Sequence, residues 1–182
     1  MLVLLGPSAS GKTESAKIMI NRYPISRVVT STTRPKRISE VDGFDYHFFS
    51  FEKFKELQKE NYFIETAEYN KNLYGTPRNE LGENKFIILE PQGLKSLLEI
   101  NPCKIIAIYL KTDESVRMSR MKERKDKQRD INRRIVSDRK DFELAKIDGL
   151  DLIIDTTNIS ISDLADLIYN KYQELLKTKQ DN

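Results

Sequence analysis

Short apolar runs alternate along the chain with longer amphipathic segments. The runs that predict strands are 2–5, 27–30, 86–89 and 104–110, with 152–154 as a fifth. Runs that are apolar at every position are typical of strands covered on both faces of a sheet. The intervening segments have apolar residues at helical spacing and predict helices over 12–22, 93–100, 113–125, 130–145 and 161–176. This alternation predicts an α/β fold built on a parallel sheet.

Residues 31–83 break this alternation and are rich in Tyr, Phe, Arg and Glu. Strand-like pieces there flank one amphipathic helix, predicted over 51–60 with Ser50 as its N-cap. We interpret the stretch as a small lobe inserted between two strands of the core. Ser160 is the expected N-cap of the last helix, and residues 177–182 are expected to form a frayed tail.

Length, charge and cysteine content narrow the class of protein. A chain of 182 residues suits one domain with an inserted lobe. Its 31 Lys and Arg against 28 Asp and Glu leave a net charge of +3, which excludes a uniformly basic nucleic-acid binder. No apolar run reaches the roughly 18–20 residues of a membrane helix. The single cysteine, Cys103, permits no internal disulfide, and we interpret it as apolar filling beside a strand. These features favour a cytoplasmic protein.

The first apolar run leads directly into the motif G-x-x-x-x-G-K-[ST], a pattern typical of triphosphate-binding loops. Glycines let the backbone bend so that its N–H groups point at phosphate oxygens, and the following helix presents its positive N-terminal end. Lys12 is expected to reach the β- and γ-phosphates, and the Thr13 hydroxyl to face Mg²⁺. A chance glycine turn is the alternative. The predicted ATP-binding residues are Gly6, Pro7, Ser8, Ala9, Ser10, Gly11, Lys12 and Thr13.

Two further segments carry groups suited to a phosphate and a base. Residues 30–48 include Arg34 and Arg37 together with several hydroxyls, and arginine forks suit phosphate oxygens. Residues 63–76 include a carboxylate, Glu65, followed by a tyrosine and a threonine. Guanine presents two adjacent N–H donors that one carboxylate can accept together, and adenine lacks this pair. Glu65 therefore favours guanine.

The two segments and the phosphate loop together resemble the guanylate kinase family in order and spacing, from about residue 3 to 170. The blocks that carry the resemblance are Thr30-Ser-Thr-Thr-Arg34 with Arg37, Glu40, Asp42-Gly43 and Asp45-Tyr46, and Phe63-Ile-Glu65 with Asn72, Tyr74, Gly75 and Thr76. The resemblance implies a P-loop NTPase-type parallel sheet flanked by helices, an inserted GMP-binding lobe and a helical lid. It also implies the reaction ATP + GMP → ADP + GDP. The implied core covers 1–30, 84–112 and 146–182; we call 31–83 the inserted lobe and 113–145 the lid.

The resemblance further implies roles for individual residues. The implied GMP-binding residues are Thr30, Arg34, Arg37, Glu40, Tyr46, Glu65, Tyr74, Thr76 and Glu90. Arg34, Arg37, Tyr46 and Tyr74 would hold the GMP phosphate, and Thr30, Glu65 and Thr76 the guanine. Glu40 would brace the arginines, and Glu90 would lie near GMP and the water shell of the metal. Mg²⁺ is the implied cofactor, with Thr13 as its protein ligand. The ordinary alternatives are solvated loop arginines, packed tyrosines and surface carboxylates.

The lid contains a strongly basic run. Residues 116–140 carry eleven Lys or Arg and four Asp or Glu. Solvated, self-paired helices are the ordinary interpretation of such a run, and nucleic-acid binding lacks aromatic residues for stacking there. The resemblance implies a lid over ATP, with Arg124 near adenine or the ATP phosphates and Arg134 between the phosphates of both substrates. Arg120 and Arg139 are weaker candidates. The predicted catalytic residues are Lys12, Arg34, Arg37, Arg124 and Arg134.

The chain departs from the family pattern at several positions. Ile88 stands where the family often has a carboxylate, which weakens a metal role for that strand. Asp155 stands near the place of an asparagine that often contacts adenine, which leaves the donor base open.

Two other functions stay open. One is a related kinase acting on another nucleoside monophosphate or a ribose bisphosphate, and the other is a non-catalytic guanylate-kinase-like binding module. The intact Lys12 and Thr13 argue against the module, as does the short chain. His47 is expected to pack in the lobe or lie at the surface, because an anionic phosphate acceptor needs no general base. ATP and GMP are the expected partners, without nucleic acid or membrane, and a homodimer stays open.

Overall fold

A five-stranded parallel sheet forms the centre of the protein. The computed structural model describes residues 1–182 except 39, 70, 101–104 and 181–182. The strands stand in the order β2-β7-β1-β8-β9, and neighbouring strands run parallel. Their bounds are β1 Leu2–Leu5, β2 Ser26–Arg27, β7 Lys85–Ile88, β8 Ile106–Lys111 and β9 Leu152–Asp155. The predicted α/β fold on a parallel sheet is confirmed.

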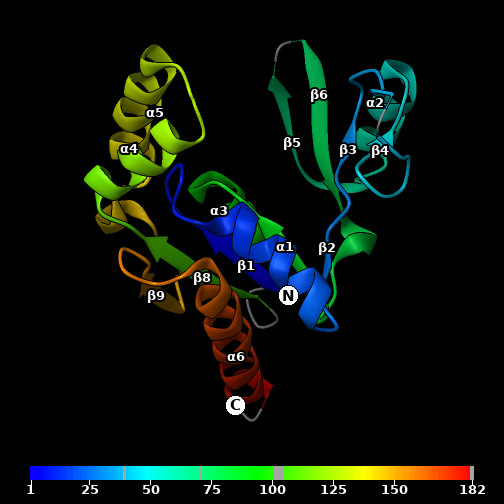
Figure 1. Ribbon diagram of the computed structural model, residues 1–182. Helices are drawn as coiled ribbons and strands as arrows, with labels where there is room; N and C mark the ends of the chain where they lie inside the picture. The colour runs from blue at the N-terminus through cyan, green and yellow to red at the C-terminus, as the bar shows by residue number, and fades with distance from the viewer. Residues whose placement is uncertain (39, 70, 101–104, 181–182) are drawn as a thin grey trace.

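Helices cover both faces of this sheet (Figure 1). They are α1 Lys12–Arg22, α3 Pro91–Ile100 and α6 Ile161–Gln180. Leu2 and Leu4 pack against α1 and α6, while Val3 and Leu5 pack against α3 on the other face. Successive side chains of a strand point to opposite faces, so a strand covered on both sides is apolar at every position.

The inserted lobe contains a second sheet of four strands in the order β4-β3-β6-β5. Its elements are β3 Ser31–Thr32, β4 His47–Phe48, α2 Phe51–Lys59, β5 Phe63–Tyr69 and β6 Asn72–Pro77. Phe54 on α2 stacks on Phe63 with ring centroids 4.3 Å apart, and Leu57 and Leu73 complete a small core. The Ser50 hydroxyl accepts the Lys53 N–H and caps α2, as predicted.

The lid consists mainly of two helices, α4 Glu114–Glu123 and α5 Gln128–Asp141. Met121, Ile131 and Ile135 form their shared apolar cluster, against which Ala9 of the loop after β1 also packs. Figure 1 shows these helices rising from the same side of the core as the second sheet. Short 3-10 helices lie at Arg78–Glu80 and Leu144–Lys146. Within the described residues, no helix is both long and apolar enough to cross a membrane.

Several predicted boundaries are wrong. The strand predicted over 27–30 ends at Arg27, because the chain then leaves the core and enters the second sheet at Ser31. The helix predicted over 130–145 ends at Asp141, and the last helix continues through the predicted tail as far as Gln180. Helix α3 begins two residues earlier than predicted, at Pro91, and α4 is shorter at both ends. Cys103 lies outside the described residues.

Candidate active site

The loop between β1 and α1 is sharply bent. Gly6 and Gly11 have φ angles of 140° and 101°, in the region that favours glycine, and Ala9 has a φ of 62°. A Cβ atom at Gly6 would also clash with the Leu110 carbonyl oxygen. Six of the eight predicted ATP-binding residues therefore lie in one tight turn, and Lys12 and Thr13 follow it as the first residues of α1. At this N-terminus, backbone N–H groups and the helix dipole favour an anion.

Lys12 points its ammonium group back into this loop. Its Nζ donates hydrogen bonds to the carbonyl oxygens of Gly6 and Pro7 and to the Ser10 hydroxyl. Burial lowers the pKa of Lys12 to about 8; the carboxylates of Asp138 and Glu90 oppose this shift, and Arg117 adds to it. Phosphate oxygens at this point would therefore meet a lysine whose present partners are neutral acceptors that they can replace.

A pocket of about 310 Å³ opens beside the loop. Its lining residues are Gly6, Ser8, Lys12, Ile88, Leu89, Glu90, Asp138 and Phe142. The exposed Glu90, which follows β7, thus shares a pocket with Lys12. Ile88 also lines the pocket and, as expected from the sequence, contributes no carboxylate.

A second cluster of predicted residues lies in the inserted lobe. Arg34 donates to Glu40 at 2.6 Å, and its guanidinium lies over the ring of Tyr46 at 5.5 Å. The rings of Tyr46 and Tyr74 are 6.2 Å apart. The hydrogen bond from Arg34, followed by the one from the backbone N–H of Arg37, lowers the pKa of Glu40. Glu40 therefore stays ionised and braces Arg34 through its side chain, but holds Arg37 only through the backbone.

Glu65 and Thr76 lie on the neighbouring strands β5 and β6, where the register shifts between Phe63 and Thr66. The Thr76 hydroxyl donates to Glu65 Oε1 at 2.8 Å. Glu65 is half-buried and Thr76 is buried. Thr30 lies where the chain passes from β2 to β3, and its carbonyl accepts the His47 N–H. The strand pairing thus joins the predicted guanine carboxylate to a hydroxyl, whereas Thr30 makes its hydrogen bond through the backbone.

The lid arginines divide into two groups. Arg120 donates to the carbonyls of Ala9 at 3.2 Å and Thr156 at 3.0 Å, and Arg124 lines a pocket with residues 9–14. Arg134 instead donates to Asp126 at 2.9 Å, and Arg139 pairs with Glu114. The structure therefore brings Arg120 and Arg124 to the phosphate loop, although Arg124 also lies 3.7 Å from Asp126. Arg134 and Arg139 are held by carboxylates of the lid.

Sequence reasoning missed two residues of this site, Arg117 and Asp138. It assigned the charges of residues 116–140 to solvated helix faces, but these two side chains are buried and Asp138 accepts hydrogen bonds from Ser8. A signal was present, because Arg117 stands four residues before Met121 and Asp138 three after Ile135. Such spacing places both charges on the apolar faces of their helices.

His47 lies half-buried in β4, with Nε2 3.4 Å from Glu80 Oε1. This placement agrees with the expected packing role in the lobe.

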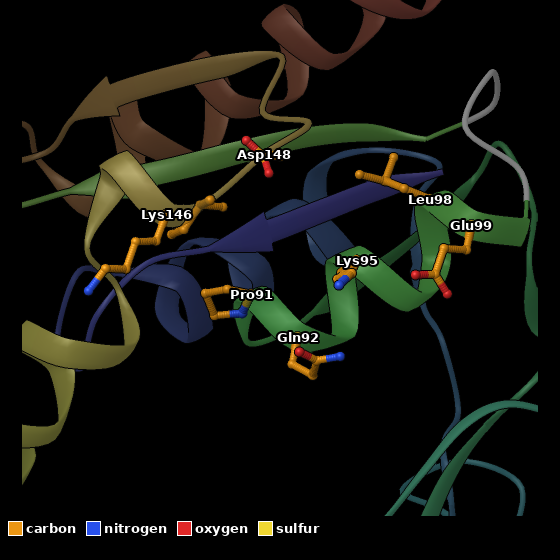
Figure 2. A pocket seen from close by; sticks show the side chains of 8 residues that line it. Pro91, Gln92, Lys95, Leu98, Glu99, Lys146 and Asp148 are labelled. Carbon is orange, nitrogen blue, oxygen red and sulfur yellow. The ribbon is translucent and has the colours of Figure 1, made fainter.

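A larger pocket of about 610 Å³ lies outside this site (Figure 2). It is lined by α3 and by residues 146–148 after the lid: Pro91, Gln92, Lys95, Leu98, Glu99, Lys146, Ile147 and Asp148. Figure 2 shows Pro91, Gln92 and Lys95 on the helix and Lys146 on the facing segment. None of the predicted site residues lines this pocket.

A parallel sheet whose first strand runs through a lysine-bearing, glycine-bent loop into a helix defines the class of P-loop nucleotide-binding proteins. A family model described as guanylate kinase matches residues 1–174. The chain belongs to the guanylate kinase family, whose members are kinases.

Individual relatives agree with this assignment. The chain is 30% identical to guanylate kinase of Wolbachia pipientis wMel, over 98% of this chain and 94% of that protein. It is 45% identical to guanylate kinase of Paramagnetospirillum magneticum, over 60% of this chain and 55% of that protein. The crystal structure of guanylate kinase from Anaplasma phagocytophilum is similar at a TM-score of 0.69 and 26% identity, covering 97% of this chain and 85% of that chain. A gluconokinase from Sinorhizobium meliloti 1021 shares the fold, with a TM-score of 0.55 at 12% identity over 97% and 93% of the two chains.

Proposed function

We propose that the protein transfers the γ-phosphoryl group of ATP to GMP, giving ADP and GDP. The observation that carries this proposal is the Glu65–Thr76 pair at 2.8 Å in the second sheet of a chain with an intact phosphate loop. Glu65 Oε1 already accepts the Thr76 hydroxyl, and its carboxylate retains lone pairs for the two guanine N–H donors. The family assignment supports the same reaction.

On the donor side, the bent loop and the first turn of α1 would hold the ATP phosphates through backbone N–H groups. Lys12 would exchange its bonds to the Gly6 and Pro7 carbonyls for bonds to the β- and γ-phosphates. Arg124 lines the pocket beside the loop and would add a positive charge there. These groups bind the donor and neutralise the charge that moves onto ADP.

On the acceptor side, Arg34 and Arg37 would bind the GMP phosphate together with the hydroxyls of Tyr46 and Tyr74. Glu40 holds the Arg34 guanidinium at 2.6 Å, so this arginine needs less ordering when the phosphate arrives. A GMP phosphate oxygen then bonds to the γ-phosphorus as the bond to the bridging oxygen breaks, and the electron pair leaves with ADP. The acceptor oxygen is already anionic, so positioning and charge neutralisation carry the reaction.

The residues at the loop fit a Mg²⁺ ion brought in with ATP. The Thr13 hydroxyl is exposed on the first turn of α1, and the exposed Glu90 carboxylate lines the pocket of Lys12. Both are oxygen groups of the kind that Mg²⁺ prefers. Among the described residues, no three His, Cys, Asp or Glu side chains gather to hold a metal. We propose Thr13 as the protein ligand, with Glu90 near the water shell; bound Mg²⁺ would neutralise phosphate charge.

We further propose the division of labour implied by the sequence: a core over 1–30, 84–112 and 146–182, an acceptor lobe over 31–83 and a lid over 113–145. Arg134 would turn from Asp126 toward the phosphates when the lid closes, which also excludes water. Action in the cytoplasm, without nucleic-acid or membrane partners, completes the proposal. Sedimentation of the purified protein tests the homodimer.

A coupled assay of ADP release tests the reaction. ATP is supplied with GMP, dGMP, AMP, CMP, UMP, ribose 1,5-bisphosphate or no acceptor. We expect GMP to give the highest kcat/KM. Turnover with another acceptor in preference to GMP would contradict the acceptor assignment. Absence of turnover with every acceptor would favour a binding module.

The Lys12→Met substitution tests the phosphate loop in the same assay. Removing its charge from the transferring phosphates is expected to lower kcat by roughly two to three orders of magnitude, with unchanged circular dichroism. Turnover near that of the wild type would contradict the loop assignment.

A further inference from the structure

The N–H, the hydroxyl and the carbonyl oxygen of Ser8 in the phosphate loop all form hydrogen bonds with side chains of the lid. Its N–H donates to Asp138 Oδ2 at 3.0 Å, and its hydroxyl donates to Asp138 Oδ1 at 3.2 Å. Its carbonyl oxygen accepts from Arg117 Nη1 at 3.4 Å. Arg117 belongs to α4 and Asp138 to α5. Both lid helices therefore meet at one residue of the loop.

The two charges that hold Ser8 form a buried ion pair. Arg117 Nη1 lies 2.7 Å from Asp138 Oδ2, and the side chains are only 6% and 7% exposed. Burying two charges costs desolvation free energy, and apolar side chains of similar size often stabilise a fold as well or better. The neighbouring Met121, Ile131 and Ile135 show that the lid can be packed with apolar residues. The stability of the lid alone therefore does not explain why Arg117 and Asp138 are buried there.

The backbone of the next loop residue, Ala9, indicates a role for the Arg117–Asp138 pair. Ala9 has a φ of 62°, which is uncommon for a residue with a Cβ atom and is retained only when its surroundings hold it. Its carbonyl accepts from Arg120 at 3.2 Å, and the preceding carbonyl accepts from Arg117. Charged lid groups therefore fix the peptides on both sides of the unfavourable turn that shapes the loop.

We propose that Arg117 and Asp138 are positioning residues that act as a clamp, through which the base of the lid holds the phosphate loop in its nucleotide-binding shape. ATP and ADP affinity then depends on the positions of α4 and α5 against the loop, whereas Arg34, Glu65 and Thr76 of the inserted lobe bind other partners than this pair. Asp138 also stands one turn after Arg134 on α5. By holding Asp138 against Ser8, the clamp therefore sets how far Arg134 lies from the phosphate loop. This inference rests on the proposed function for its kinetic test, but not for its binding test.

The double substitution R117M/D138A removes the clamp without leaving one buried charge unpaired, which a single truncation would do. We expect the KM for ATP to rise at least tenfold and the KM for GMP to stay within twofold of the wild type. The dissociation constant for ADP, measured by calorimetry without GMP, is expected to rise by a similar factor. Unchanged ADP affinity in a folded double variant would overturn the clamp.

The matched control is D130N. Asp130 and Arg133 form an exposed ion pair at 3.0 Å on α5, away from the loop and from the clamp. Glu114 is unsuitable as a control because it lies 4.0 Å from Arg117. D130N is expected to leave both KM values and the ADP affinity within twofold. If D130N weakens ADP binding as much as the double variant does, or if the double variant raises both KM values equally, general loosening of the lid replaces the clamp.

A milder variant covers the case in which the double variant does not fold. D138N retains an acceptor for the Ser8 N–H but loses the charge beside Arg117, so we expect ADP affinity to fall between those of the wild type and the double variant. D138N with wild-type ADP affinity would then overturn the proposal. A wild-type protein that binds ADP but does not phosphorylate GMP would overturn the proposed function and leave the calorimetric test of the clamp intact.

Discussion

Lys12 is the side chain on which the chemistry of the donor depends most directly. Burial sets its pKa near 8, with Asp138 and Glu90 opposing the shift and Arg117 adding to it. A bound triphosphate would place negative charge against the ammonium group and raise this pKa. Because only the charged lysine attracts phosphate, donor binding becomes linked to protonation.

We therefore expect ATP affinity to be nearly constant below pH 8 and to fall by up to about tenfold per pH unit above it. Above pH 8, binding should take up a fraction of a proton. Calorimetric titration with ATP in two buffers of different ionisation enthalpy measures this fraction. Lys12→Met, titrated in the same way, should lose the uptake. An affinity that stays flat from pH 7 to 9.5 would show that Lys12 is charged throughout.

Glu65 should decide between guanine and other bases. Glu65→Gln keeps the size of the side chain but replaces one acceptor by an NH₂ group that faces the guanine donors. Loss of a hydrogen bond to a charged group costs about 1.5–3 kcal/mol, so the KM for GMP is expected to rise roughly 10- to 150-fold. The KM for ATP should stay within twofold.

Glu68, exposed on the same strand, provides the control for this substitution. E68Q is expected to leave both KM values unchanged. An equal rise in the KM for GMP in both variants, or an equal rise for ATP and GMP in Glu65→Gln, would remove Glu65 from the guanine site.

Single residues were predictable from the sequence where the chemistry is local. The phosphate loop is continuous in sequence, so its glycines, Lys12 and Thr13 could be identified with their context. Asp138 could not be assigned in this way, because its partner Ser8 lies 130 residues away in the chain. The same holds for the choice among lid arginines, since only folding decides which of them meets Ala9 and which meets Asp126.

Helix α5 contributes a charged residue to several ion pairs of the lid. Arg134 donates to Asp126 at 2.9 Å, and the neighbouring Arg133 pairs with Asp130 at 3.0 Å. Successive helix residues point about 100° apart, so the two arginines face different directions. Substituting each of them in turn therefore tests which face of α5 contributes charge to the transferring phosphoryl group.

We expect Arg134→Ala to lower kcat by roughly two orders of magnitude, because it would remove a positive charge aimed at the transferring phosphoryl group. Arg133→Ala should leave kcat within twofold. Rapid-quench measurement of the phosphoryl-transfer step separates this effect from product release. Similar losses in both variants would indicate a general contribution of lid charge and would contradict the assigned role of Arg134.

Elements could be predicted where a local signal marks both of their ends. Helix α1 has the predicted bounds because the phosphate loop fixes its start. The helix over 130–145 stops at Asp141 for a tertiary reason: the Phe142 carbonyl accepts the Tyr109 hydroxyl, and the Phe142 ring packs in the core. The strand predicted over 27–30 is short because the chain must cross to a second sheet, which no local pattern indicates.

Over the complete chain, the charge is divided unevenly. Residues 116–140 carry a net charge of +7 although the total is +3, so the remainder of the protein is mildly acidic. The lid and the inserted lobe rise from the same side of the core, and each contains arginines (Figure 1). Two phosphate-bearing substrates between these parts would neutralise charge on both. The arrangement therefore favours closure only when both substrates are present.

We expect the lobe and lid to approach each other most with GMP and a non-hydrolysable ATP analogue together, and less with either alone. Fluorescent labels at cysteines replacing Lys53 on α2 and Arg129 on α5, in a chain carrying C103S, would report the distance by energy transfer. Labels at cysteines replacing Asn21 and Asn170, both exposed on core helices, should show no change. A lobe-to-lid distance that is the same with both substrates as with neither would contradict closure, and Arg134 would then have to reach the phosphates by side-chain rotation alone.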